Sequence, residues 1–449
     1  MAVSIIFYLF YFILCFIVPL ASIYKVNTKL ILIAILFVAQ FNATTFFRAG
    51  ITIGFFEVAI LITFICILVK FKINTNKIFI SSSDKVFISF LFFSILSVIV
   101  ASFRVFFKDI IPSNEYDTSP VIRSIMSLNK VIIFVPVLLF IRNYIYKKND
   151  NYEHSKNTFF YILALSGIVP SLAVIFQSLN IGFQLIHNNP SFGEIFHIET
   201  YNNVRPVGLS NEASFFAYSL FFSYMGVIEM LIRDSRKKRT MIGIIIFYWI
   251  ALVLTISRTG MLIFIAYSIY KFFSIQSFKP ATVIKFTIVL VVTGFILSNI
   301  TIHNFNLADR FLSSFNVEAD ASTIERFGVS DALYRLLLDK SKILGVGIYD
   351  YGYYIKPYLP YYMNSIYYAP GEAPPSFNFI LQLVAELGPL LFIGMIVNII
   401  FVLEKSDRFV KEWFIFLALF ALSFQVLNFS IPFLILLYPI KKRENIIYN

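Results

Sequence analysis

The sequence predicts an all-α fold, a polytopic bundle of 12 or 13 transmembrane helices, and three observations lead to this prediction. The 449 residues are 59% hydrophobic and only 14% charged, whereas soluble domains carry roughly 25% charged residues. Apolar runs of roughly 20 residues, long enough to cross a bilayer as helices, recur from end to end. They do not alternate polar and apolar residues as the shorter strands of a membrane barrel do.

The expected spans follow one another along the chain, with both short and long connections between them. Eleven are expected at about residues 3–21, 29–46, 50–69, 86–103, 129–146, 158–178, 213–232, 241–256, 261–276, 283–299 and 376–403. A last apolar run, at about 412–440, is interrupted near Asn428-Phe-Ser-Ile-Pro432. It is either one tilted helix or a hairpin of two short helices.

Lysines and arginines concentrate in short loops between these runs, around residues 70–85, 147–156, 233–239 and 405–411. The positive-inside rule makes these loops cytoplasmic. The formal net charge of +12 is therefore explained by the cytoplasmic loops, and no nucleic-acid partner is expected. Lys441-Lys442-Arg443 should also be cytoplasmic, which favours the hairpin for 412–440. Counting backwards places residue 1 outside, but only Lys25 and Lys29 mark the first two spans, so the N-terminal orientation stays open.

The opposite side of the membrane then receives two long loops, 179–212 and 300–375. The predicted organisation is a membrane bundle over 1–299 that includes loop 179–212, the large loop 300–375, and C-terminal membrane helices over 376–449. Apolar positions spaced along 320–343 predict an amphipathic helix within the large loop.

Three arginines lie on this non-cytoplasmic side, at or near the ends of apolar runs. Arg205 precedes the span at 213, Arg258 sits in the tight turn between two spans, and Arg326 opens the amphipathic helix. Guanidinium groups bind phosphate and diphosphate through paired hydrogen bonds, so the three can clamp a diphosphate that projects from a lipid. The alternative is that each arginine snorkels to the interface or forms a structural ion pair.

Carboxylates and tyrosines of the same side are further candidates. Glu212 either stabilises the N-terminus of the next helix or deprotonates an incoming hydroxyl, and Glu372 is a second candidate base. Eight tyrosines crowd residues 350–368, among them Tyr351 and Tyr354. Their rings suit stacking on sugars, although interfacial aromatic belts are the competing explanation.

The sequence contains no GxxxxGK[ST] phosphate loop, no HExxH and no CxxC motif. Its four histidines share no metal-ligand spacing, and Cys15 and Cys66 both fall within apolar runs. We therefore expect no metal and no cofactor.

Four segments between about residues 200 and 395 stand in a specific order. They are Arg205-Pro-Val-Gly208 with Asn211-Glu212, then Leu254-Thr-Ile-Ser257-Arg258-Thr-Gly260, then Arg326 with Gly345-Val-Gly347, and finally Ser376-Phe-Asn378 with Glu386-Leu-Gly388. Together they resemble the O-antigen polymerase and O-antigen ligase superfamily of multispan glycosyltransferases, which use undecaprenyl-diphosphate donors. The ligases usually carry a histidine directly before the asparagine of the last motif, where this chain has Phe377. A phenyl ring cannot accept a proton, so the departure favours a Wzy-type polymerase.

The resemblance implies a glycosyltransferase that joins undecaprenyl-diphosphate-linked oligosaccharide units at the periplasmic face of a bacterial inner membrane, for O-antigen, capsule or exopolysaccharide. We expect Arg205, Glu212, Arg258 and Arg326 to be catalytic. Substrate contacts are expected from Asn211, Ser257, Tyr351, Tyr354, Glu372 and Asn378. The expected partners are the donor and acceptor lipids and the bilayer, and a chain-length regulator is a candidate. An O-antigen ligase and a lipid-linked oligosaccharide flippase are the alternative functions.

Overall fold

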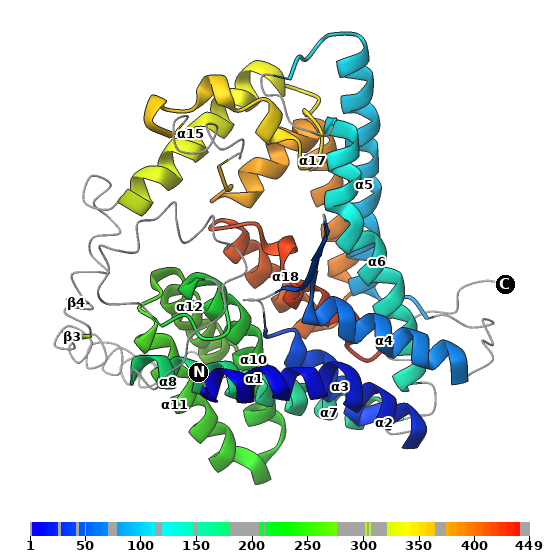
Figure 1. The fold of residues 1–449 in the computed structure, drawn as a ribbon, viewed down its shortest axis with the longest axis vertical. Coiled ribbons are helices and arrows are strands. Elements are labelled where there is room, and N and C mark those ends of the chain that lie inside the picture. Colours follow the sequence, from blue (N-terminus) through cyan, green and yellow to red (C-terminus); the bar gives the residue numbers. More distant parts are fainter. Residues whose placement is uncertain are drawn as a thin grey trace. The chain divides into compact units, whose positions relative to one another are not determined.

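A computed structural model describes residues 2–25, 28–41, 45–49, 51–70, 79–112, 119–146, 151–179, 206–210, 212–275, 301–302, 305–306, 321–363 and 374–440. Within these ranges the chain is almost entirely helical (Figure 1), which confirms the predicted class. Five described helices are long and apolar enough to cross a bilayer: Ser82–Phe106, Ile122–Tyr146, Tyr152–Ser178, Ala213–Arg233 and Phe379–Glu404.

The helices and strands follow the apolar pattern closely. In chain order they are α1 (Ala2–Phe12), the π-helix η1 (Ile13–Ile17), α2 (Val18–Lys25), α3 (Thr28–Val38), β1 (Thr45–Ala49), β2 (Ile51–Gly54), α4 (Phe55–Lys70), α5 (Ser82–Phe106), α6 (Pro120–Tyr146), α7 (Tyr152–Ser166), α8 (Ile168–Ser178), α10 (Ala213–Arg233), the 3-10 helix η3 (Ser235–Lys237), α11 (Lys238–Leu254), α12 (Arg258–Ile275), β3 (Thr301–Ile302), β4 (Phe305–Asn306), α15 (Ala321–Lys340), the 3-10 helices η6 (Tyr351–Tyr353) and η7 (Lys356–Tyr358), α17 (Phe379–Glu404), α18 (Arg408–Ala421), and the 3-10 helices η8 (Val426–Asn428) and η9 (Ile431–Leu437).

Several expected spans differ in detail from the structure, and one lies outside the described residues. The run at 29–46 is helical only to Val38, and an antiparallel hairpin of β1 and β2 follows. The run at 158–178 is divided at Gly167 into α7 and α8. A side chain at Gly167 would meet the Tyr248 hydroxyl at 2.8 Å, so close packing requires glycine there. The run at 283–299 lies outside the described residues.

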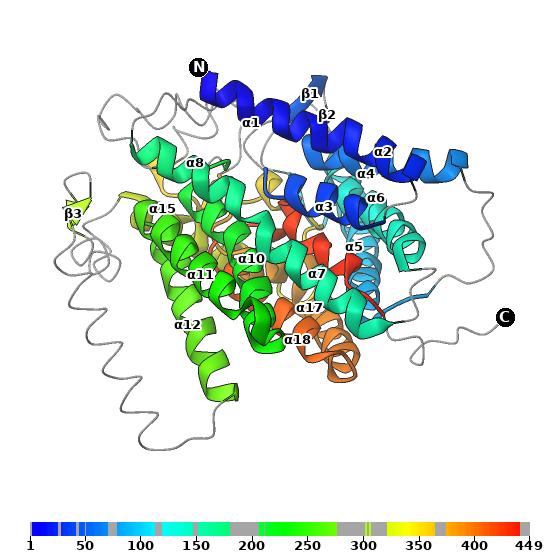
Figure 2. The ribbon, with the colours of Figure 1, turned by 90° about the horizontal axis from the view of Figure 1, so that it is seen from below.

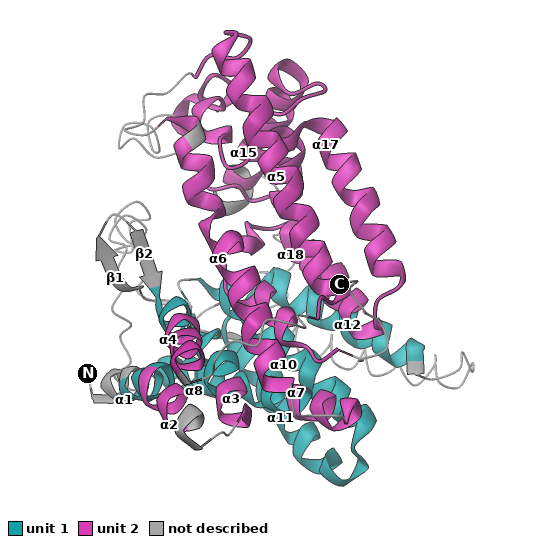
Figure 3. Cartoon of the chain, turned by 90° about the vertical axis from the view of Figure 1, so that its right-hand side faces the viewer, with its two compact units in different colours: residues 1–15, 33–58, 160–323 teal, residues 16–32, 59–159, 324–449 magenta. Residues whose placement is uncertain are grey.

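The chain forms two compact units (Figure 3). Unit 1 comprises residues 1–15, 33–58 and 160–323, and unit 2 comprises residues 16–32, 59–159 and 324–449. Each is described by itself below.

In unit 1, α8, α10, α11 and α12 lie side by side (Figure 2). Helices α10 and α12 run parallel, because residues further along α10 contact residues further along α12. The rings of Phe221 and Phe264 are 5.5 Å apart, the Tyr224 hydroxyl lies 2.7 Å from Ser268 Oγ, and Lys271 Nζ pairs with Glu229 Oε1 at 2.5 Å.

In unit 2, α5 packs along α6 and α17 (Figure 1). Helices α5 and α17 are antiparallel. Ser89 Oγ near the start of α5 donates to Asn398 Oδ1 at 2.8 Å, and Ser97 Oγ donates to the carbonyl of Glu386 at 2.9 Å. The end of unit 2 that holds the start of α5 therefore also holds the end of α17.

The last apolar run folds back on itself. It forms α18, then η8 and η9, and the ring of Tyr438 stacks on that of Phe409 with centroids 5.4 Å apart. The chain has thus returned to the start of α18, as the hairpin interpretation requires. The returning arm is the buried 3-10 helix η9, which packs against α6.

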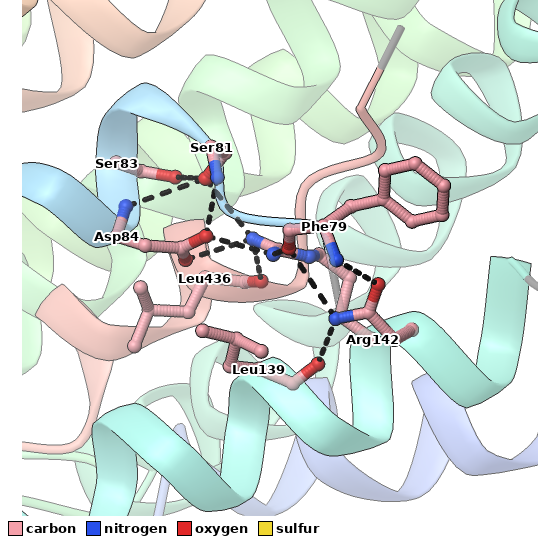
Figure 4. Close-up of polar contacts among 8 residues, drawn as sticks. Phe79, Ser81, Ser83, Asp84, Leu139, Arg142 and Leu436 are labelled. Carbon is pink, nitrogen blue, oxygen red and sulfur yellow. Dashed lines mark hydrogen bonds and ion pairs between the residues drawn. The ribbon is translucent and has the colours of Figure 1, made fainter. Parts of the chain in front are cut away.

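One buried ion pair joins three elements at the end of unit 2 that carries the basic loops (Figure 4). Arg142 in α6 and Asp84 in the first turn of α5 are 1% and 0% exposed, and Nη2 lies 2.7 Å from Oδ2. Arg142 Nη1 donates to Asp84 Oδ1 at 2.8 Å and to the carbonyl of Leu436 at 3.1 Å. Its Nη2 also donates to the carbonyl of Phe79 at 2.7 Å. The two-point pairing fixes α5 against α6, and the contact with Leu436 ties η9 to both.

Replacing Arg142 with methionine should destabilise the protein by about 3–5 kcal/mol, because it leaves the carboxylate of Asp84 buried without its cation. Thermal unfolding in detergent measures the loss. Arg335→Ala is the matched control, since Arg335 pairs with Asp331 in the exposed face of α15 with side chains 62% and 54% exposed, and it should cost less than about 1 kcal/mol. Equal melting of Arg142→Met and the wild type would contradict the role of the pair.

Candidate active site

The predicted site residues fall into three groups. Arg205, Asn211 and Glu372 lie outside the described residues. Glu212, Ser257 and Arg258 belong to unit 1, and Arg326, Tyr351, Tyr354 and Asn378 belong to unit 2. The meeting of the three arginines at one diphosphate therefore stays a prediction.

Glu212 and Arg258 lie at the same end of unit 1. Glu212 precedes α10 and Arg258 begins α12, and these helices are parallel. Gly260 packs against the Ala217 side chain, so the first turns of both helices are in contact. Ser257 is 2% exposed, and its carbonyl accepts the N–H of Met261 at 2.9 Å. This end of unit 1 lies opposite the basic loop 233–239, as the predicted topology requires.

The segment before Glu212 is held by a residue that sequence reasoning missed, Gln177 at the end of α8. Its Oε1 accepts the N–H groups of Val207 and Gly208 at 2.9 and 2.8 Å, and its Nε2 donates to the carbonyl of Gly208 at 2.9 Å. Gly208 has φ +63°, and a side chain there would meet the ring of Phe216 at 2.7 Å. Glycine is therefore required in the motif around Arg205 for both conformation and space.

In unit 2 the structure joins two segments of the sequence motifs through their backbones. Helix α17 is broken at Gly388, which has φ +77° and precedes Pro389. The carbonyls left without helical partners accept N–H groups from the glycine turn, defined here as residues 345–347. Gly345, Val346 and Gly347 donate to Leu387, Ala385 and Glu386 at 3.2, 3.3 and 3.0 Å.

Arg104, at the end of α5, secures the same turn. Its Nη1 donates to the carbonyls of Leu344 and Gly345 at 2.6 and 2.9 Å, and its Nη2 donates to the carbonyl of Lys340 at 2.7 Å. Lys340 ends α15, so the guanidinium also caps the C-terminus of that helix, where a cation is favoured. Arg104 therefore fixes the end of the helix that carries Arg326.

A buried carboxylate holds the next stretch of backbone. Glu386 is 0% exposed, and its Oε1 accepts from Gln382 Nε2 at 2.9 Å and from the N–H of Tyr351 at 3.4 Å. The N–H of Tyr349 bonds the same carboxylate. Tyr349 has φ +62°, and this turn points the N–H groups of Tyr349 and Tyr351 at one carboxyl. Glu386 thereby fixes the position of Asp350, between the two donors.

Asp350 is an almost fully buried acidic residue at this end of unit 2, and it lies outside the membrane spans. It is 1% exposed, and its Oδ2 accepts from Ser124 Oγ at 2.6 Å. Burial raises the pKa of Asp350 to about 7, although the bond from Ser124 and the charge of Arg123 act in the opposite direction. Among the described residues its Oδ1 has no hydrogen-bond partner. A carboxyl with such a pKa can exchange a proton at neutral pH.

Arg326 in α15 contacts Phe377, which directly precedes Asn378 at the start of α17. The guanidinium carbon of Arg326 lies over the ring of Phe377, 5.4 Å from its centroid. Asn378 caps α17, because its Oδ1 accepts the N–H of Leu381 at 3.0 Å. Tyr351 and Tyr354 are 7% and 3% exposed, within a hydrophobic cluster that also packs against Phe377.

This site lies at the end of unit 2 opposite the basic loops, because it is formed by the end of α5, the start of α6 and the start of α17. Arg326 offers a planar cation suited to phosphate, and Asp350 offers a proton acceptor. Glu386 had a signal in the sequence, since a carboxylate inside an apolar span indicates a functional or structural site by default. Asp350 and Arg104 had no comparable signal.

Comparison with known protein families gives a match that includes residues of this site. Residues 243–396 match the model of a family described as O-antigen ligase. The match includes Arg258, Arg326, the glycine turn and Phe377. It supports the O-antigen ligase and polymerase superfamily, and it indicates a glycosyltransferase-like function on lipid-linked oligosaccharides. No curated protein and no solved structure matches the chain.

Replacing Gly388 with alanine should break the backbone interlock, that is, the hydrogen bonds between α17 and the glycine turn. The added Cβ would lie 2.6 Å from the carbonyl oxygen of Ile343, in a conformation that side chains rarely adopt. We expect a loss above about 3 kcal/mol, measured by thermal unfolding in detergent. Gly243→Ala is the control, because nothing lies within 4 Å of its Cβ position in α11, and it should gain roughly 0.5–1 kcal/mol. Equal stability of both variants would argue against the interlock.

Asp350→Asn should stabilise the protein more at pH 8 than at pH 5. With a pKa of about 7, the native carboxyl keeps a proton that the unfolded chain loses near pH 4. Stability of the wild type therefore falls as the pH rises from about 4 to 7, and the loss is complete above 7. Asparagine cannot ionise, so the variant escapes this loss, of which about 3 kcal/mol falls between pH 5 and pH 8.

Thermal unfolding of the wild type and Asp350→Asn at both pH values measures this difference. The charged or titratable groups around Asp350 are Arg123, Glu386 and Tyr354, and both proteins retain them. Asp331→Asn, at an exposed position of α15, controls for removal of a surface charge. An identical difference at pH 5 and pH 8 would show that Asp350 does not hold a proton in the folded protein at pH 5.

Proposed function

We propose that this protein is a polysaccharide repeat-unit polymerase. It would join undecaprenyl-diphosphate-linked oligosaccharides at the periplasmic face of a bacterial inner membrane. The observation that carries the choice is Phe377, which stands where a ligase is expected to have histidine and lies within the matched region. A phenyl ring cannot accept the proton of an acceptor hydroxyl, so the ligase mechanism lacks its expected base.

In the proposed reaction, a hydroxyl of the acceptor unit attacks the anomeric carbon of the donor glycan. The bond from that carbon to the diphosphate breaks, and undecaprenyl diphosphate leaves with the electron pair. The polymer thereby grows at its reducing end by one unit. The donor bond is already activated, so alignment of the two lipids and stabilisation of the leaving group supply the catalysis.

The arginines hold the diphosphate in this proposal. Arg258 and Arg326 bind the donor, Arg205 binds the diphosphate or the acceptor, and Glu212 accepts the proton. The position of Arg258 supports its role, because it begins α12, where N–H groups and the helix dipole attract anions. Glu212 is exposed at the same end of unit 1 and is therefore accessible to a hydroxyl.

The remaining predicted residues form the sugar-binding part of the proposal. Asn211, Ser257, Glu372 and Asn378 are proposed to contact substrate, and the buried rings of Tyr351 and Tyr354 to support its binding surface. A chain-length regulator is proposed as a partner.

An O-antigen ligase is the second candidate, because the matching family is described by that name. Deletion of the gene separates the two. Loss of a polymerase leaves one repeat unit on the acceptor, whereas loss of a ligase leaves long polymer on undecaprenyl diphosphate. Long lipid-linked polymer in the deletion strain would show that the protein is a ligase and not a polymerase.

Replacing Arg205, Arg258 or Arg326 with alanine should abolish polymer and leave single-repeat lipid intact, because the leaving diphosphate loses a cation. Gel separation of the extracted glycolipids measures chain length, and immunoblotting confirms membrane insertion. Arg335→Ala, on the exposed face of the same helix as Arg326, should retain full-length polymer. Wild-type chain lengths in all three variants would reject the diphosphate clamp.

A further inference from the structure

We infer that Phe377 is a positioning residue that orients the guanidinium of Arg326 through the face of its ring. The inference rests on the proposed function, in which Arg326 binds the donor diphosphate. It adds a specific role for Phe377, whose ring would act as a platform for the cation.

The first support is the contact itself. The guanidinium carbon of Arg326 lies 5.4 Å from the ring centroid of Phe377, within the roughly 6 Å over which a cation is attracted by an aromatic face. A guanidinium stacks on a ring with its plane defined. Its outward N–H groups are then directed before the ligand arrives, and binding costs less conformational entropy.

The second support is that both partners are held by independent contacts. Phe377 packs against a hydrophobic cluster that includes Tyr354 and Leu336, and the next residue, Asn378, caps α17. Arg326 belongs to α15, whose end is tied by Arg104. The ring is therefore a fixed element, and Arg326 is the side chain that it can orient.

The third support is the geometry of this end of unit 2 as a whole. A second arginine, Arg123, lies over the ring of Tyr353 at 5.5 Å from its centroid. Both rings belong to, or pack against, the same hydrophobic cluster. The cluster thus presents aromatic faces to cations at its edge, whereas the guanidinium of Arg104 is engaged with backbone carbonyls.

The test compares substitutions that distinguish the effect of the aromatic face at residue 377 from the effect of side-chain volume. Phe377→Leu keeps an apolar side chain of similar size but removes the aromatic face, and Phe377→Tyr and Phe377→Trp keep the face. The assay measures kcat/KM of the purified protein in proteoliposomes, with undecaprenyl-diphosphate-linked repeat unit isolated from the deletion strain. We expect Phe377→Leu to lose about 10-fold in kcat/KM and the two aromatic variants to remain within about 3-fold of the wild type.

A matched control and a paired variant distinguish positioning from packing. Phe379→Leu removes a ring from a position that is 2% exposed, two residues further along. It should lower the melting temperature about as much as Phe377→Leu, with kcat/KM within about 2-fold of the wild type. In an Arg326→Lys background, Phe377→Leu should cost less than in the wild type, because the planar group that the ring orients is absent.

Two outcomes would overturn the inference. If Phe377→Leu retains the kcat/KM of Phe377→Tyr, the aromatic face has no role. If Phe377→His exceeds the wild type, the position serves proton transfer instead. Failure of the proposed function is recognised separately, because the wild-type protein would then form no polymer in the proteoliposomes, whatever the result at residue 377.

Discussion

The hydrogen bonds between the glycine turn and the broken helix α17 are the constraint on which the candidate site in unit 2 depends. Gly388 leaves the helical path, and the carbonyls that it frees are taken by Gly345, Val346 and Gly347. The turn follows the helix of Arg326 and precedes Asp350, while α17 begins beside Phe377. One backbone interlock therefore sets the positions of a cation, a carboxyl and an aromatic ring that are far apart in the sequence.

The same site shows how a protein keeps charges at the edge of an apolar environment. Each ionisable side chain has specific partners: Asp109 and backbone carbonyls for Arg104, amide and backbone N–H groups for Glu386, and a hydroxyl and a nearby arginine for Asp350. Such contacts offset the cost of desolvation. They also restrict each side chain to one position, which is the property that a site for two tethered substrates requires.

Much of the fold follows from the sequence, because hydropathy and basic loops report directly on burial in a bilayer. The helices α5, α6, α10 and α17 correspond to apolar runs, and the amphipathic pattern at 320–343 corresponds to α15. The hairpin after residue 38 and the 3-10 geometry of η9 were not predictable in this way. Both segments are apolar, and apolarity specifies burial without specifying the backbone conformation.

For the candidate site, the sequence motifs gave only part of the arrangement. They contained the glycines at 208, 345 and 388, but their partners were not apparent. Gln177 is a polar residue at a helix end, and Arg104 is one of many arginines near a span end. Nothing in the local pattern shows that these two bind backbone groups of distant segments. Phe377 was noticed for the residue that it replaces, whereas its contact with Arg326 required the three-dimensional structure.

The buried pair of Arg142 and Asp84 has a consequence for how the protein is made. Its carbonyl partner, Leu436, lies 294 residues beyond Arg142, so translation of most of the chain separates the two. Helices α5 and α6 must reside in the bilayer with this acceptor missing until η9 emerges from the ribosome. Completion of unit 2 is therefore a late event of synthesis, and a product truncated before residue 431 leaves this polar contact unfinished.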